Sequence, residues 1–138
     1  MKLNHDCVRD VLLFVEEEQR PGIFLHLNDF ISIQDKDTST KKRLSMYDAE
    51  TIKYTLMKLH ETGYLKDNLS IISGRLVEYS TGALTWEGHK FLDTIRDQKI
   101  WKTTKEVASH LESVSITLIS NIASNVLENY IQRFIPKP

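Results

Sequence analysis

The fold of this chain is decided by the stretch LTWEGHKFLDTIRDQKIW, residues 84–101, where a β pattern gives way to a helical one. Leu84 ends a run of strand-forming residues. Thr85 follows with the short hydroxyl side chain that caps a helix by accepting a hydrogen bond from a free backbone N–H. Apolar residues then recur at the spacing of a helix packed along one face: Trp86, Phe91, Leu92, Ile95 and Trp101. The stretch therefore predicts a strand that leads directly into a largely buried helix.

A capped helix is predicted upstream, over residues 46–62. Ser45 and Asp48 resemble a capping box, and Gly63 is a good C-cap residue. Between them, apolar residues mark one buried side at helical spacing: Ala49, Ile52, Leu56 and Leu59.

Strands are predicted on both sides of this helix. Residues 69–80 are strand-like and contain Ser73-Gly74, which is typical of the tight turn of a β-hairpin. Apolar and polar residues alternate over 23–33, which indicates another strand, and the polar run over 34–42 indicates an exposed loop.

Helices are predicted at both ends of the chain. The first begins after Asn4 or His5 and ends before Arg20-Pro21-Gly22, a stop signal. Amphipathic helices are expected over 102–111, with Val107 and Leu111 on the apolar side, and over 113–135.

The order helix, strand, capped helix, hairpin, helix is that of a winged helix. We therefore expect an α+β fold, with a winged-helix-like domain over 1–100 and an extra C-terminal helical segment over 101–138. The helix at 46–62 would be the recognition helix and the antiparallel hairpin its wing. The short helix that usually precedes a recognition helix has only the polar residues 34–44 available to form it.

Composition and motifs limit the expected cellular location and the kinds of site that the chain could contain. The 138 residues carry a formal net charge of −1, and one cysteine, Cys7, rules out an intramolecular disulfide. The polar start MKLNHD resembles no secretory signal, so we expect a cytoplasmic protein. The five histidines lack the spacing of a metal site, and no GxxxxGK[ST], GxGxxG or GxSxG motif occurs.

His89 fits a structural role, packing its helix against the wing while Gly88 allows close approach. We expect no cofactor and no enzymatic activity.

Four segments carry a family resemblance: MKLNHDCVRDVLL, YTLMKLHETGYL, LTWEGHKFLDTIRDQKIWKTTKE and SNIASNVL. Together they resemble a family of bacterial and phage proteins catalogued as a domain of unknown function. The LTxxGxxFL portion is also similar to YjcQ-like winged-helix proteins. The resemblance implies a winged-helix-like fold and a phage, prophage or bacterial cytoplasmic setting, and it implies no particular ligand.

Charge is unevenly distributed along the chain. Residues 1–40 carry four Lys or Arg and eight Asp or Glu, residues 41–66 carry six and three, and residues 67–138 carry eight of each. The basic surplus therefore falls on the predicted recognition helix and its approach. If the chain contacts DNA, these residues are the candidates: Lys41, Lys42, Arg43, Lys53, Tyr54, Lys58 and Arg75. An ordinary solvated helix face is the alternative, which Glu50 and Glu61 favour.

The C-terminal helix provides a second candidate surface. It has no charged residue over 113–127, yet Ser, Thr and Asn are too frequent there for a membrane span. It could fold back on its own domain, pair with another subunit or lie in a membrane interface, and its wide apolar arc favours pairing. The candidate oligomer contacts are Leu118, Ile119, Ile122, Val126 and Tyr130.

These observations predict a small DNA-binding or regulatory protein of phage or prophage origin that acts as a dimer on double-stranded DNA. The alternative is a protein-interaction module or phage-encoded inhibitor that uses the same scaffold without contacting DNA.

Overall fold

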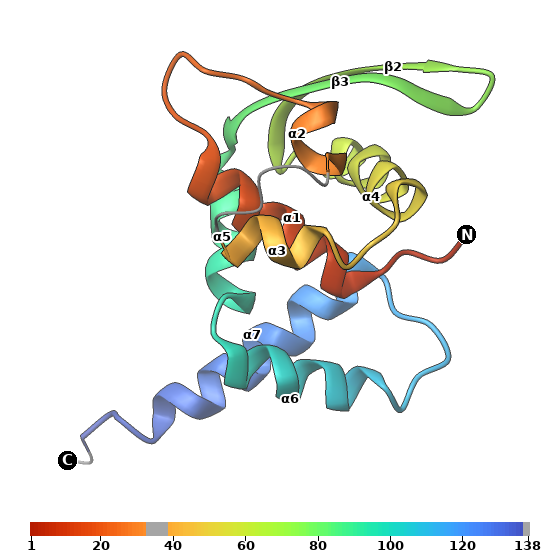
Figure 1. Cartoon of the computed structure of the whole chain (residues 1–138). Coiled ribbons are helices and arrows are strands. Elements are labelled where there is room, and N and C mark those ends of the chain that lie inside the picture. Colours follow the sequence, from red (N-terminus) through yellow and green to blue (C-terminus); the bar gives the residue numbers. More distant parts are fainter. Residues whose placement is uncertain (33–38, 137–138) are drawn as a thin grey trace. The chain divides into compact units, whose positions relative to one another are not determined.

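The computed structural model describes residues 1–32 and 39–136. These form two compact units, Met1–His89 and Lys90–Pro138. Figure 1 shows the elements along the chain. They are α1 (His5–Glu18), β1 (Leu25–His26), α2 (Leu27–Ile31), α3 (Ser39–Leu44), α4 (Ala49–Thr62), β2 (Leu65–Ile72), β3 (Arg75–Leu84), α5 (Trp86–Ile95), α6 (Gln98–Ala108) and α7 (Ile116–Gln132).

The first unit contains a three-stranded antiparallel sheet in the order β1-β3-β2. β2 and β3 form the predicted hairpin, which is longer than expected (Figure 1). Ser73 and Gly74 close it with φ angles of 51° and 76°. Positive φ at both central residues matches the twist of the flanking strands, and the glycine adopts it without a steric penalty. With seven helices and this sheet in the described residues, the chain has the predicted α+β, winged-helix-like fold.

The strand predicted over 23–33 is wrong beyond His26, and residue 33 lies outside the described part of the chain. β1 pairs with β3 only through Leu25 and His26, and the chain then turns into α2. The backbone N–H of His26 donates a 2.8 Å hydrogen bond to the Asp29 carboxylate. This local bond offers the backbone a helical start in place of further strand pairing.

The polar loop predicted over 34–42 is also partly wrong, because α3 begins at Ser39. Residues 34–38 lie outside the described part. Thr40 and Leu44 are buried in a helix that packs on α1, so two positions suffice to hold it. α3 is the short helix that the winged-helix order requires before α4. α3 was not predicted because a helix of about one and a half turns contains too few apolar residues to show a helical period, and most of its residues are polar.

α4 begins at Ala49, three positions later than predicted, because Asp48 is its N-cap. The Asp48 carboxylate accepts a 2.7 Å hydrogen bond from the backbone N–H of Thr51. Ser45 does not form the expected capping box, since its hydroxyl donates to the Lys42 carbonyl at the end of α3. Gly63 ends α4 with φ 75°, the left-handed C-cap that was predicted.

The core of the first unit lies where α1 packs on α3 and α4 (Figure 1). Aromatic side chains extend this core to the sheet, since the Phe14 and Phe30 rings lie 5.1 Å apart and the Phe30 and Tyr79 rings 5.7 Å apart, both edge to face. Fully burying each large apolar side chain stabilises the fold by roughly 1.5–3 kcal/mol. The most completely buried side chains include Val8, Val11, Leu12, Val15, Ile52, Leu56 and Leu59.

The strand-to-helix junction is formed as predicted. The Thr85 hydroxyl accepts from the Gly88 N–H at 3.1 Å and donates to the Gly63 carbonyl at 2.7 Å. A Cβ on Gly88 would lie 2.2 Å from the Tyr64 carbonyl oxygen, so only glycine fits there. His89, expected to pack against the wing, is instead exposed.

The predicted helical stripe is buried at three positions in α5: Phe91, Leu92 and Ile95. Trp86 was also expected to be buried but is 78% exposed, because the first residue of α5 lies off the buried stripe.

In the second unit, α6 packs against α7. α6 starts after Asp97, whose carboxylate caps the N–H groups of Lys99 and Ile100, so the buried Trp101 belongs to α6. The helix predicted over 102–111 is therefore displaced, and its expected apolar residues Val107 and Leu111 are exposed. α7 begins after the Ser115 cap, within the range predicted for it.

Candidate nucleic-acid interface

Three of the seven candidate DNA contacts lie on α4. Ile52, Thr55, Leu56 and Leu59 are the buried residues of this helix. Lys53, Tyr54 and Lys58 are only partly covered, and they lie on the sides of α4 that the core leaves accessible. The helix therefore buries its apolar stripe and presents two cations and a phenol to solvent.

The hairpin brings Arg75 to the same place. A cavity of about 420 Å³ lies between α4 and the start of β3. The residues that line it from the helix include Glu50, Lys53, Tyr54 and Met57, and those that line it from the hairpin include Arg75 and Val77. Tertiary structure thus brings Lys53, Tyr54 and Arg75 together although they are far apart in the sequence. We call this cavity the helix–hairpin cavity.

The three cations of α3 do not line this cavity. Lys42 is exposed, and Lys41 and Arg43 are half-buried. The Arg43 guanidinium lies 3.7 Å from the Asp10 carboxylate on α1, and the Tyr47 hydroxyl donates a 2.6 Å hydrogen bond to the same carboxylate. Asp10 therefore connects the α3–α4 junction to α1. Arg43, a candidate DNA contact, is already paired with a carboxylate within the protein.

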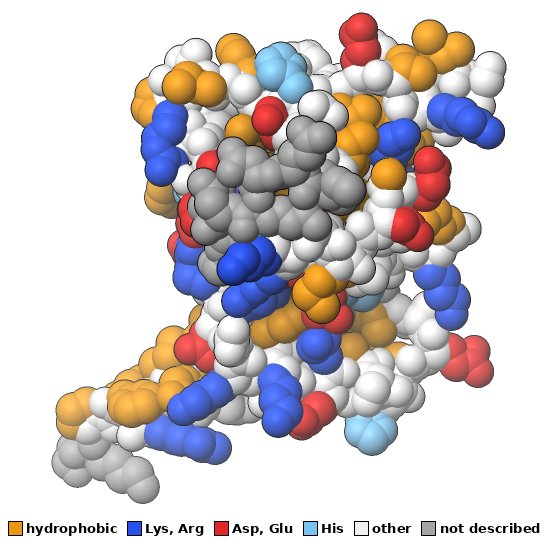
Figure 2. All heavy atoms as spheres, in the orientation of Figure 1, with side chains coloured by type: hydrophobic (Ala, Val, Ile, Leu, Met, Phe, Trp, Pro, Cys, Tyr) orange, Lys and Arg blue, Asp and Glu red, His pale blue; other side chains and the backbone are white. Residues whose placement is uncertain are grey.

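Acidic neighbours offset the cations of α4. Lys53 lies 3.8 Å from Glu50, and Lys58 lies 3.0 Å from Glu61. Hydrogen bonding and attraction to Glu61 raise the pKa of Lys58 above its usual value, so this amine stays charged. The Lys58 ammonium also lies 5.7 Å from the Tyr54 ring centroid. Figure 2 shows both basic and acidic side chains on the face that it draws.

Two candidate cations have no such partner. In the part of the chain that the structure describes, Lys42 and Arg75 make no ion pair. Arg75 is also exposed at the end of the hairpin. These two side chains are the most available to an outside anion.

Sequence reasoning missed the carboxylate that joins α4 to the hairpin. The Asp67 side chain on β2 is 3% exposed and accepts hydrogen bonds of 2.7 Å from His60 Nδ1 and from the Tyr79 hydroxyl. An acidic residue inside a strand pattern was the one available signal. Because His60 lies near the end of α4 and Tyr79 lies on β3, Asp67 fixes the hairpin relative to α4.

The five candidate oligomer contacts on α7 are not equivalent. Ile119 is 1% exposed within the single chain, whereas Leu118 is exposed. Ile122, Val126 and Tyr130 are half-buried. A second copy could therefore reach the other four more readily than Ile119. No helix in the described residues is long and apolar enough to cross a membrane.

In residues 1–32 and 39–136, no three His, Cys, Asp or Glu side chains are grouped so as to hold a metal ion. Cys7 is buried, and its desolvation raises the pKa of the thiol to about 11.

The topology and the helix–hairpin cavity define an α+β protein of the winged-helix-like class. Residues 2–115 match the family described as hypothetical protein (DUF2513), so the chain belongs to this family. It is also similar to an uncharacterized protein of Haemophilus influenzae, with 28% identity over 130 residues that cover 92% of this chain and 96% of that protein. No solved structure matches the chain.

Proposed function

We propose that this chain is a small, non-enzymatic DNA-binding or regulatory protein whose α4 and β2–β3 hairpin contact duplex DNA. We further propose that it is of phage or prophage origin and acts in the cytoplasm as a dimer. The observation that supports DNA binding is the helix–hairpin cavity, where Lys53 and Tyr54 of α4 meet Arg75 of the hairpin. A helix of this kind fits the major groove, and an adjacent hairpin can reach the phosphates beside it.

The ion pairs on α4 are compatible with this proposal. Exposed pairs such as Lys53–Glu50 contribute only about 0–1 kcal/mol, so a lysine can exchange its carboxylate for a phosphate at little cost. The carboxylates do weaken the local positive potential, however. We therefore expect modest affinity that depends strongly on salt, with Arg75 and Lys53 among the contacts.

The test is fluorescence anisotropy with a mixed-sequence duplex at several salt concentrations between roughly 50 and 200 mM. The double variant Lys53→Ala with Arg75→Ala should reduce the slope of log affinity against log salt by up to about 2, since each lost phosphate contact removes about 0.9. The control is Lys99→Ala with Lys102→Ala, two exposed lysines of α6. It changes net charge equally and should leave the slope unchanged if α4 and the hairpin carry binding.

Failure to bind duplex even at ~50 mM salt, where the electrostatic contribution is large, would contradict the proposal. An equal loss of slope in the control would also contradict it, because binding would then follow net charge.

A protein-interaction module or inhibitor is the second candidate. The balanced charges of α4 favour it, as does the pair Tyr54 and Met57 in the helix–hairpin cavity. Aromatic and methionine side chains are enriched at the centres of protein interfaces. If duplex binding is absent, a double Tyr54→Ala and Met57→Ala variant should lose a protein partner that the parent chain retains in pull-down experiments.

A further inference from the structure

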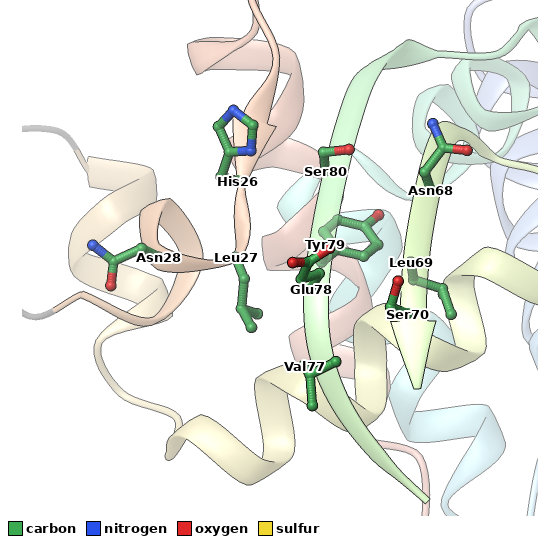
Figure 3. Close-up of a pocket in the computed structure, with 10 residues that line it drawn as sticks. All are labelled: His26, Leu27, Asn28, Asn68, Leu69, Ser70, Val77, Glu78, Tyr79 and Ser80. Atoms are coloured by element: carbon green, nitrogen blue, oxygen red, sulfur yellow. The ribbon is translucent and has the colours of Figure 1, made fainter. Parts of the chain in front are cut away.

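A second cavity, of about 510 Å³, lies against the sheet in the first unit. Figure 3 shows that it extends from the β1–α2 junction across β3 to β2. We call it the sheet cavity. Its volume is within the range of small-molecule sites. Val77 borders both cavities, and the other sheet-cavity residues play no part in the proposed DNA contact.

Strand register collects polar side chains in this cavity. Ser80 lies opposite His26 on β1 and opposite Asn68 on β2, so these three form one row across the sheet. Glu78 lies opposite Ser70 in the next row. Opposed residues and residues two apart in a strand share a face, so these five side chains lie together. All are exposed except Ser80, which is half-buried.

The chemistry of the lining selects a ligand class. Amide, hydroxyl and imidazole groups both donate and accept hydrogen bonds, which suits a molecule with several hydroxyls. Glu78 is the single Asp, Glu, Lys or Arg side chain among the described lining residues, and its carboxylate only accepts hydrogen bonds. That lining has no Lys or Arg, so the one full charge that a phosphate or carboxylate ligand would meet there is the Glu78 carboxylate, which repels it. A positive charge would be attracted.

We propose that the sheet cavity binds a small polyhydroxylated amine of the amino-sugar class. The ligand hydroxyls would bond to Asn68, Ser70 and Ser80, and its ammonium would lie against the Glu78 carboxylate. Leu27, which also lines the cavity, would contact the carbon skeleton. The proposal does not depend on DNA binding.

Glucosamine and glucose, titrated by NMR at neutral pH, test this directly. Glucosamine should shift the backbone amide signals of residues 77–80 and bind roughly two- to fivefold more tightly than glucose, the difference expected of one exposed charge pair. Glu78→Gln should abolish this preference. The exposed Glu78 contributes no core packing, so the variant should fold normally. Glu106→Gln on α6, equally exposed and outside the cavity, should keep the preference.

Three outcomes would overturn the proposal. The first is the absence of shifts at residues 77–80 with glucosamine up to ~50 mM, since even millimolar affinity would saturate there. The second is equal binding of the two sugars to the parent chain. The third is a glucosamine preference that persists in Glu78→Gln.

Discussion

At the scale of single residues, Tyr79 connects the core to the charged network of the hairpin. Its ring packs on Phe30, and its hydroxyl donates to the nearly inaccessible Asp67 carboxylate. Burial and then the Asp67 charge raise the pKa of the Tyr79 phenol above its ordinary value. Burial and the Asp10 carboxylate raise the pKa of Tyr47 in the same direction.

These shifts predict a loss of stability in alkali. A tyrosine in the unfolded chain ionises near pH 10, whereas the folded phenols stay neutral at higher pH. Their contribution is therefore fully present below pH ~10 and is lost as pH rises above it, by up to about 1.4 kcal/mol per pH unit for each tyrosine. Urea unfolding between roughly pH 9 and 11 should show this slope, with a shallower one for Tyr79→Phe. Identical slopes in both proteins would contradict this prediction, because they would mean that Tyr79 ionises as readily in the folded chain as in the unfolded chain.

Cys7 should be unreactive in the folded protein. It is completely buried on α1, and desolvation raises the pKa of its thiol to about 11, so almost no thiolate exists at neutral pH. A thiol reagent such as dithionitrobenzoate should label it rapidly in denaturant and slowly, at the rate of opening, in buffer. Immediate stoichiometric labelling of the native chain would contradict this burial.

At the scale of elements, α5 shows that position on a helix decides what a large side chain contributes. Phe91 is 4% exposed, whereas Trp86 in the same helix is mostly solvent-exposed. Phe91→Ala should therefore lower the free energy of unfolding by roughly 3–5 kcal/mol, through lost burial and the cavity that remains. Trp86→Ala, the matched control, should change it by about 0.5 kcal/mol or less.

Denaturant melts of the two variants would measure this difference. A cost below about 1 kcal/mol for Phe91→Ala would show that α5 is not packed as described. A cost for Trp86→Ala similar to that for Phe91→Ala would show that the indole is covered in solution.

At the scale of the whole molecule, α7 predicts self-association. Apolar residues on and just after this helix remain exposed, among them Leu118, Ile131, Phe134 and Ile135. Glu128 is the one charged residue within α7. We expect light scattering to give a dimer or larger mass at tens of micromolar, and Leu118→Glu to shift it toward the monomer. A monomer mass for the parent chain at that concentration would contradict this prediction.

The sequence by itself determined the features whose causes are local. Gly63 and Ser73-Gly74 were recognised because few residues adopt positive φ easily, and Thr85 because a hydroxyl after a strand readily caps a helix. The apolar stripe of α5 and the buried side of α4 were recognised because periodicity indicates which side of a long helix is covered. These signals were sufficient for the α+β, winged-helix-like fold, although they did not reveal α2 or α3.

Tertiary structure decided the features that depend on residues distant in the chain. β1 pairs with β3 through only two residues, Leu25 and His26, and α3 is held by two side chains buried against α1. Periodicity did not reveal that Trp86 lies outside the core. It also did not reveal that the Asp67 carboxylate accepts hydrogen bonds from both His60 and Tyr79. Both candidate cavities arise in the same way, because strand register and helix packing, rather than sequence spacing, determine which polar side chains meet.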